Sequence, residues 1–145
     1  MKKIIKDILQ EKGAEVHTIE QDETVYAALT KLAEKNIGAL VVVDKQGSVV
    51  GIMSEREYAR RVILKGLSSL NTPVKAILRE KVYYVHPNNS VEDCMALITE
   101  ARCRHLPVME NGELLGLVSI GDLVKATIEE KEFLINQLTD YIKSG

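Results

Sequence analysis

The sequence predicts an α/β chain, of the α+β kind, that consists of two similar halves. A short apolar stretch closed by Ser-x-x-acid occurs twice, at residues 48–57 and 113–122, and the two copies are 65 positions apart. Upstream of each copy, apolar residues with helical spacing recur 66 positions apart, namely Val25, Ala28, Leu29 and Leu32 and then Val91, Cys94, Met95 and Ile98. The offset changes only in a loop and leaves the core pattern intact, which is typical of an internal duplication.

Length and composition set limits on the function. A chain of 145 residues can bury a sufficient core without a metal or a disulfide. Its net charge of −2 gives no general attraction to nucleic acids or membrane surfaces. No apolar run approaches the ~18 residues of a membrane span, and the first residues do not form a secretory signal. Cys94 and Cys103 fit no metal-binding or redox motif. We therefore expect a cytoplasmic protein with no bound metal and no membrane contact.

The first half is expected to contain a helix, a strand, a helix, two strands and a helix. Residues 3–12 have one apolar face and stop at Gly13, and residues 15–19 alternate between polar and apolar side chains as a strand does. Thr24 caps the next helix, which ends near Asn36. The remaining elements are a buried strand, a return strand and a helix, expected at residues 39–43, 49–53 and 54–65.

The second half repeats this order. Residues 82–85 match the first strand, and Ser90 caps the helix that follows. Strands at residues 105–109 and 114–118 form a hairpin, because Asn111-Gly112 between them favours a type I′ turn. We therefore divide the chain into an N-terminal helix, a first repeat, a linker with a short helix, a second repeat and a C-terminal helix, over residues 1–13, 14–65, 66–81, 82–128 and 129–145.

The C-terminal helix carries isoleucines spaced by sevens, Ile128, Ile135 and Ile142. A heptad spacing is typical of a helix that pairs with another helix, although three positions are fewer than a coiled coil needs. The pattern leaves two alternatives open, which are packing on the chain's own domain and contact with a partner in a dimer.

The two Ser-x-x-acid motifs are expected where a strand meets the N-terminus of a helix. There the first backbone N–H groups lack partners and the local field is positive, which favours a phosphate. The acidic residue three positions on, Glu57 or Asp122, can accept hydrogen bonds from two sugar hydroxyls. The pattern therefore predicts a nucleotide site. The same pattern is also a capping box, in which Ser54 or Ser119 and the acid satisfy the helix end without a ligand.

The paired motifs, the run at residues 104–108 and the loop and helix between the halves resemble a tandem pair of cystathionine-β-synthase (CBS) domains. The resemblance covers residues 14–128, and residues 54–61 further resemble the small stand-alone bacterial members and their organellar plant relatives. It implies two repeats packed with pseudo-twofold symmetry and two clefts for an adenosine ligand such as AMP, ATP, NAD or S-adenosylmethionine. It also implies that two chains form a flat homodimeric disk.

The resemblance assigns roles to residues of both halves. Asp122 would hold the ribose, Ser119 would hold the ribose or the phosphate, and Arg104 and His105 would face the phosphate. One cleft would be lined around the adenine by Val16, His17, Thr18, Gly38, Ala39 and Leu40. The other cleft would be lined by Val82, Tyr83, Tyr84, Cys103 and Arg104. The corresponding motif of the first half is carried by Ser54, Arg56 and Glu57.

The first half departs from the family pattern because Glu57 stands where Asp is usual. One extra methylene moves the carboxylate by about a bond length, and Arg61 lies at i+4, where it can pair with Glu57. We therefore expect the site of Asp122 to be the stronger one. Arg56 and Arg60 share a helix face that either meets a di- or triphosphate or is simply solvated.

Other candidates allow a core role as well as contact with a ligand. His105 either begins a packed strand or meets the ligand, Cys94 is expected in the core, and Cys103 lies at a strand edge. The three histidines show no metal-ligand spacing. One Phe, no Trp and no broad basic surface argue against a nucleic-acid partner.

These observations predict a regulatory module that binds an adenine nucleotide and signals to a partner protein. The alternative is a ligand-free subunit for protein interaction and dimerisation, with degenerate clefts, and the Glu57 departure favours it. No nucleophile, base and orienting residue can be assembled from the sequence, so we expect no catalytic residue and no enzymatic turnover.

Overall fold

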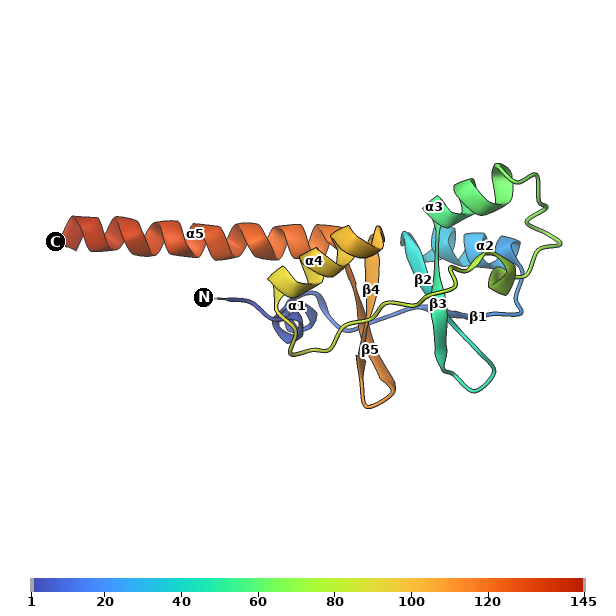
Figure 1. Ribbon diagram of the computed structural model, residues 1–145, viewed down its shortest axis with the longest axis horizontal. Coiled ribbons are helices and arrows are strands. Elements are labelled where there is room, and N and C mark those ends of the chain that lie inside the picture. The colour runs from blue at the N-terminus through green and yellow to red at the C-terminus, as the bar shows by residue number, and fades with distance from the viewer. Residues whose placement is uncertain (1, 145) are drawn as a thin grey trace. The chain divides into compact units, whose positions relative to one another are not determined.

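The computed structural model describes residues 2–144, and the side chains of residues 2–143, as two compact units (Figure 1). The central unit is Val16–Val82, and the terminal unit joins the segment up to Glu15 to the segment from Tyr83 onward. Both units mix helices with strands, which confirms the predicted fold class.

The central unit is built around a three-stranded sheet. Its strands, in their order across the sheet, are β1 (Thr18–Glu20), β2 (Ala39–Val43) and β3 (Val49–Ser54). β1 runs parallel to β2 and β3 runs antiparallel to it, so Val41 pairs with Thr18 on one side and with Ile52 on the other. The continuous β-branched run is therefore the middle strand, as its apolar character on both faces predicts.

The helices of the central unit are α2 (Val25–Lys35), α3 (Glu55–Tyr58), the π-helical η1 (Ala59–Ile63) and the 3₁₀-helical η2 (Val74–Ile77). Thr24 caps α2, because its side chain accepts a hydrogen bond from the Ala27 N–H at 3.1 Å. The helix expected at residues 54–65 begins as predicted but widens into a π-helix after Tyr58. Leu64 N–H accordingly bonds to the Ala59 carbonyl, five residues back.

The core of the central unit contains the apolar face of α2, side chains of β2 and β3, and the short helix η2. Its fully buried members are Val25, Ala28, Leu40, Val42, Met53, Val62 and Val74. The helix face predicted from the repeated spacing therefore does pack inward.

The terminal unit repeats this arrangement. It contains α1 (Ile5–Lys12), α4 (Val91–Ala101), β4 (His105–Glu110), β5 (Glu113–Ser119) and α5 (Ile120–Ser144). Ser90 caps α4 by accepting a hydrogen bond from Asp93 N–H at 3.0 Å. The turn between β4 and β5 has positive φ at both Asn111 (51°) and Gly112 (79°), which confirms the predicted type I′ hairpin.

The strand predicted at residues 82–85 is reduced to a single parallel bridge between Val85 and Val108. The corresponding strand of the central unit is held by a hydrogen bond from Val41 N–H to the His17 carbonyl, at 3.1 Å. The residue 66 positions after Val41 is Pro107, which has no N–H to donate. Pro107 therefore removes the bond that would extend the pairing upstream of Val85.

The helix that precedes one repeat packs in the unit of the other repeat. α1 lies in the terminal unit, where Ile4 forms an antiparallel bridge with Ser90. η2 lies in the central unit, where Pro73 forms the corresponding bridge with Thr24. Each bridge thus joins the start of the incoming helix to the capping residue of the repeat's own helix.

Two glycines give these incoming helices room. A Cβ atom on Gly116 would lie 2.8 Å from Leu9 Cδ2 of α1, and a Cβ atom on Gly51 would lie 3.0 Å from Leu78 Cδ2, just after η2. Leu9 and Leu78 are 69 positions apart, as are the first residues of the two helices. α1 and η2 are therefore equivalent elements of the duplication.

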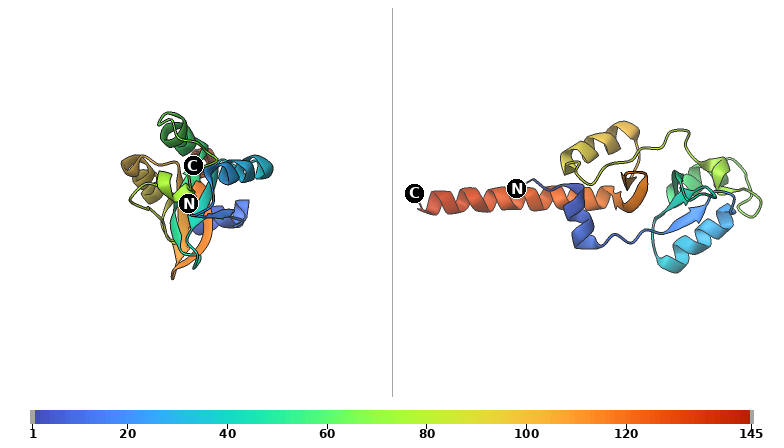
Figure 2. Two further views of the ribbon diagram at one scale, coloured as in Figure 1. Left: turned by 90° about the vertical axis from the view of Figure 1, so that its right-hand side faces the viewer. Right: turned by 90° about the horizontal axis from the view of Figure 1, so that it is seen from below.

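α5 is one continuous helix that runs from the end of the predicted second repeat (82–128) through the predicted C-terminal helix (129–145). Figure 2 shows α1 and α4 on opposite sides of its first turns, beyond which α5 continues without a neighbour in its unit. Leu123 and Ala126 are buried, but every side chain from residue 131 to 143 is exposed. No helix in the described part of the chain has the length and apolar character of a membrane span.

Candidate functional site

The Ser-x-x-Asp motif of the terminal unit lies where β5 runs directly into α5. Ser119 N–H donates to Asp122 Oδ2 at 2.9 Å, and Asp122 N–H donates to Ser119 Oγ at 3.1 Å. This is a complete capping box. The cap fixes the Asp122 carboxylate at the N-terminus of a long helix, where the backbone field favours negative charge.

Lys12 supplies a positive charge to this carboxylate. It lies in the last turn of α1, and its Nζ is 2.7 Å from Asp122 Oδ2 and 3.0 Å from the Leu117 carbonyl oxygen. The Lys12 side chain is 39% exposed and that of Asp122 is 23% exposed, so the pair lies at a partly screened surface. One side chain therefore ties the incoming helix α1 to both β5 and α5.

The strand β4 brings Arg104 and His105 beside the motif. His105 pairs with Ser119 in the hairpin register, and Ile120 N–H donates to the Arg104 carbonyl at 2.9 Å. Of the first three N–H groups of α5, those of Ile120 and Asp122 are thus engaged.

The charged side chains around the motif shift the pKa values of Asp122 and His105. Partial burial acts to raise the pKa of Asp122, but Lys12 and the Ser119 N–H and hydroxyl outweigh it and hold that pKa below its usual value. Burial lowers the pKa of His105, and the nearby positive charges of Lys12 and Arg104 add to this against the opposing pull of Asp122. At neutral pH the site therefore holds an ionised carboxylate and an uncharged imidazole.

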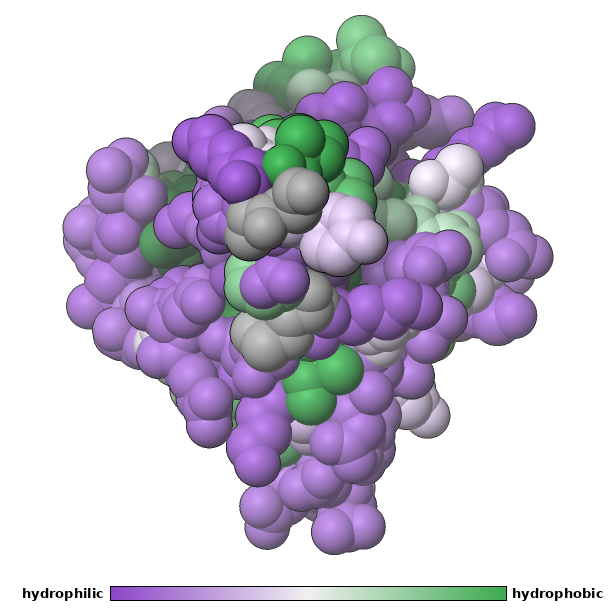
Figure 3. All heavy atoms as spheres, turned by 90° about the vertical axis from the view of Figure 1, so that its left-hand side faces the viewer, coloured by the Kyte–Doolittle hydropathy of each residue, from purple (hydrophilic) through white to green (hydrophobic). Residues whose placement is uncertain are grey.

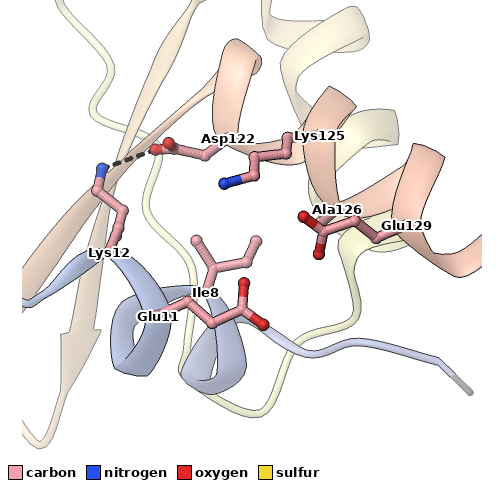
Figure 4. Close-up of a pocket in the computed structure, with 7 residues that line it drawn as sticks. All are labelled: Ile8, Glu11, Lys12, Asp122, Lys125, Ala126 and Glu129. Carbon is pink, nitrogen blue, oxygen red and sulfur yellow. Dashed lines mark hydrogen bonds and ion pairs between the residues drawn. The ribbon is translucent and has the colours of Figure 1, made fainter.

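A shallow pocket opens beside Asp122, between α1 and α5 (Figure 4). In Figure 4, Lys12 and Asp122 lie to the left, Lys125 and Glu129 extend from α5 in the centre and at the right, and the Ile8 side chain and the Glu11 carboxylate lie below them. The seven residues that line it are Ile8, Glu11, Lys12, Asp122, Lys125, Ala126 and Glu129. Apart from Asp122, none of them is a site residue predicted from the sequence.

The corresponding motif of the central unit is occupied differently. Ser54 Oγ accepts a hydrogen bond from Glu57 N–H at 3.3 Å, and Glu57 Oε2 lies 2.9 Å from Arg61 Nε. Arg61 also donates from Nη1 to the Leu78 carbonyl at 3.3 Å. The i, i+4 ion pair considered from the sequence is therefore present, and it engages the carboxylate that stands in the place of Asp122.

The remaining predicted site residues are divided between the units. The central unit holds Val16, His17, Thr18, Gly38, Ala39, Leu40, Arg56 and Val82, and the terminal unit holds Tyr83, Tyr84 and Cys103. Leu40 is fully buried, so only its backbone can meet a ligand, whereas Tyr84 is 61% exposed. Cys94 lies in the core of the terminal unit as predicted, where burial and the charge of Asp93 raise its pKa to about 11. Within the described residues, no cluster of three or more His, Cys, Asp or Glu could hold a metal ion.

The family model of the CBS domain matches this chain twice, over residues 5–63 and 74–129. The chain belongs to the CBS-domain family. The matched segments begin with α1 and η2, the two helices that each pack in the unit of the other repeat. The predicted repeats, in contrast, begin at residues 14 and 82. Proteins with such domain pairs are generally regulatory, and many bind nucleotides.

Similar proteins occur in bacteria and plants. The CBS domain-containing protein CBSX3, mitochondrial, of Arabidopsis thaliana is 38% identical over 149 residues, which cover 97% of this chain and 72% of the relative. A solved CBS-domain protein from Burkholderia ambifaria is 48% identical with a TM-score of 0.83, over 88% of this chain and 95% of that chain. The CBS-domain containing protein ATU1752 from Agrobacterium tumefaciens is 38% identical with a TM-score of 0.81, over the same shares.

Proposed function

We propose that this chain is a regulatory module that binds an adenine nucleotide, mainly through Ser119 and Asp122. The module signals the presence of the nucleotide to a partner protein. The observation that carries the proposal is the ionised Asp122 carboxylate, which the capping box holds at the N-terminus of α5 beside Arg104 and His105. A carboxylate is an acceptor for two adjacent ribose hydroxyls, and a helix N-terminus with a nearby arginine suits a phosphate.

A ligand that binds Asp122 has to displace the Lys12 ammonium from its carboxylate. A ribose that approaches Asp122 competes with the Lys12 ammonium for the carboxylate oxygens, and a released ammonium is then free to meet the phosphate. His105, uncharged at neutral pH, offers one donor and one acceptor to the same ligand. We propose no catalytic step, because these groups bind and orient a ligand without supplying a nucleophile and its base.

The central motif is proposed as the weaker site. Glu57 is held by Arg61 on its own helix turn, so a ribose there must displace a neighbouring guanidinium. Val16, His17, Thr18, Gly38 and Ala39, with the Leu40 backbone, are proposed to face one adenine, and Val82, Tyr83, Tyr84 and Cys103 the other. Arg56 is proposed to meet a phosphate next to Ser54. AMP, ATP, NAD and S-adenosylmethionine are the ligands considered.

A second candidate function is a ligand-free interaction subunit. It is favoured by the observation that both motif carboxylates already have a basic partner, Lys12 or Arg61. In either case the protein is proposed to act as a homodimer, as the family resemblance implies. A cytoplasmic location stays a prediction, and the Arabidopsis relative is named as mitochondrial.

Titration of the chain with AMP, ATP, NAD and S-adenosylmethionine, followed by thermal unfolding, separates the two functions. A ligand at a hundred times its dissociation constant stabilises the folded chain by about 2.7 kcal/mol, which is a readily measured shift. CMP is the matched control, because it shares the ribose and phosphate but not the adenine. A shift with AMP that exceeds the shift with CMP supports the nucleotide module, and no shift with any of the four ligands supports the interaction subunit.

A further inference from the structure

α5 exposes apolar side chains along one side, interrupted at Lys131, that nothing in its own unit covers. We define the α5 seam as the exposed apolar residues along one side of this helix, which are Val124, Ile128, Leu134, Ile135, Leu138, Tyr141 and Ile142. Leu134 and Ile135 are 55% and 62% exposed, and Tyr141 and Ile142 are 78% and 74% exposed. In Figure 3, seen from the side on which α5 ends, hydrophobic side chains are exposed among hydrophilic ones.

The exposed stretch is too long and too apolar to be explained as a solvated helix end. A helix of about 12–15 residues is marginal in water on its own, and the 13 positions from 131 to 143 have no buried side chain. A helix that stands free in water is normally polar all round, and exposed apolar surface of this extent marks an interaction site. The seam therefore needs a partner surface.

The seam is separate from the face that packs on the terminal unit. That packed face consists of Leu123 and Ala126, which are 0% and 3% exposed. The seam follows heptad positions, because Val124, Ile128, Ile135, Leu138 and Ile142 are spaced by four, seven, three and four residues. Lys131 occupies the one heptad position in this series that is not apolar. This is the pattern of a helix that pairs with another helix along one stripe.

We propose that the α5 seam pairs with the α5 seam of a second copy of this chain, in antiparallel orientation. A parallel pair would place Lys131 beside the partner's Lys131 in the same buried layer, where two like charges repel. An antiparallel pair centred beside residue 133 places the two lysines in neighbouring layers, about 6 Å apart along the axis, and not in one layer. It places Val124 opposite the partner's Ile142, Ile128 opposite the partner's Leu138, and Lys131 opposite the partner's Ile135.

Charge complementarity selects a second copy as the occupant. In the antiparallel register Lys131 of each copy comes next to the partner's Glu132, so the pair forms two ion pairs across the twofold axis. Every layer that does not contain Lys131 is entirely apolar. The opposite side of the helix carries Glu129 and Glu130, whereas a helix that lies on a membrane surface is rich in lysine and arginine there. The paired stretch from Val124 to Ile142 is about 28 Å long. This pairing does not depend on the proposed nucleotide site.

The first test compares two glutamate substitutions at neighbouring exposed positions, Ile135→Glu in the seam and Asn136→Glu outside it. Both add one negative charge, and Glu is a good helix former, so neither change removes the helix itself. Sedimentation velocity of the full chain over a hundredfold concentration range should show that Ile135→Glu weakens self-association at least about tenfold. Asn136→Glu should associate as the unchanged chain does.

The second test measures orientation and is independent of any other contact between copies. Chains with Ile128→Cys and chains with Leu138→Cys, distinguished by a tag and both carrying Cys103→Ser, are mixed and oxidised. The antiparallel pair should give mainly the mixed disulfide, because these positions face each other across the axis. A disulfide between two Ile128→Cys chains in preference to the mixed one overturns the orientation. Absence of any cross-link, or binding of a monomeric chain to anionic vesicles that Ile135→Glu abolishes, overturns the proposal.

Discussion

Replacement of Lys12 by methionine tests how the candidate site is held together. The structure gives Lys12 one ion pair with Asp122, at 2.7 Å, between side chains that are 39% and 23% exposed. A partly exposed pair contributes about 0.5–1 kcal/mol to stability. Since 1 kcal/mol shifts the Tm of a chain of this size by about 3–5 °C, Lys12→Met should lower the Tm by that amount at most. Methionine keeps the helix propensity and the length of the side chain, so the change removes mainly the charge.

A double-mutant cycle with Asp122→Asn isolates the pair from other effects of the change. At pH 7 the two substitutions together should cost about 0.5–1 kcal/mol less than the sum of the separate costs, measured by urea unfolding. The pKa of folded Asp122 lies below its unfolded value, so this coupling is present above about pH 4 and is lost as the pH falls through the folded pKa. Lys6→Met, at an exposed position of the same helix, is the control. Additive costs at pH 7, or a coupling that persists after Asp122 is protonated, would refute the reasoning.

Three further predictions follow from the site and the fold. Asp122→Ala should weaken AMP binding more than Glu57→Ala in calorimetric titrations, because the Asp122 carboxylate is fixed by a complete cap; the opposite order would contradict the proposed ranking. Burial lowers the pKa of folded His105, so the unfolded chain takes up a proton more readily and stability should fall as the pH drops below about 6.5. His105→Gln should flatten that part of the stability profile, and an unchanged slope would show that other groups cause it. Gly116→Ala should destabilise the chain by about 1 kcal/mol, the low end for overpacking, because its Cβ would lie 2.8 Å from Leu9 Cδ2, the end of a side chain that can shift. Leu9→Ala in the same chain should make the added cost of Gly116→Ala smaller, and equal costs in both backgrounds would place the clash elsewhere.

Local sequence chemistry predicts the elements and their ends well. The caps at Thr24 and Ser90, the turn at Asn111 and the pairing of Glu57 with Arg61 all depend on residues within four positions of each other. Such contacts are decided by the backbone geometry of one helix turn or one hairpin, which the residue types themselves favour. The duplicated spacing adds the common architecture of the two halves.

Local sequence patterns do not predict the contacts between segments that are distant in the sequence. Lys12 meets Asp122 across 110 positions, and nothing in its neighbourhood distinguishes it from the other lysines of an amphipathic helix. The exchange of α1 and η2 is visible only as a second offset of 69, which the sequence interpretation did not use. The loss of the strand at residues 82–85 depends on Pro107 in a strand that pairs with it, so it becomes apparent only once the register is known.

The capping role of the Ser-x-x-acid motif and its proposed ligand role support each other. A carboxylate that accepts the Ser119 N–H is already oriented and ionised, so a ribose that binds it has less side-chain freedom to remove. Lys12 covers one side of the same carboxylate but is itself partly exposed. A ligand can therefore displace Lys12 at a small cost in free energy. Glu57 has one more rotatable bond, and its guanidinium partner is held in turn by the Leu78 carbonyl. A ligand at that motif must therefore order a longer side chain and release a doubly held one, which is the physical reason to propose that the two sites are unequal.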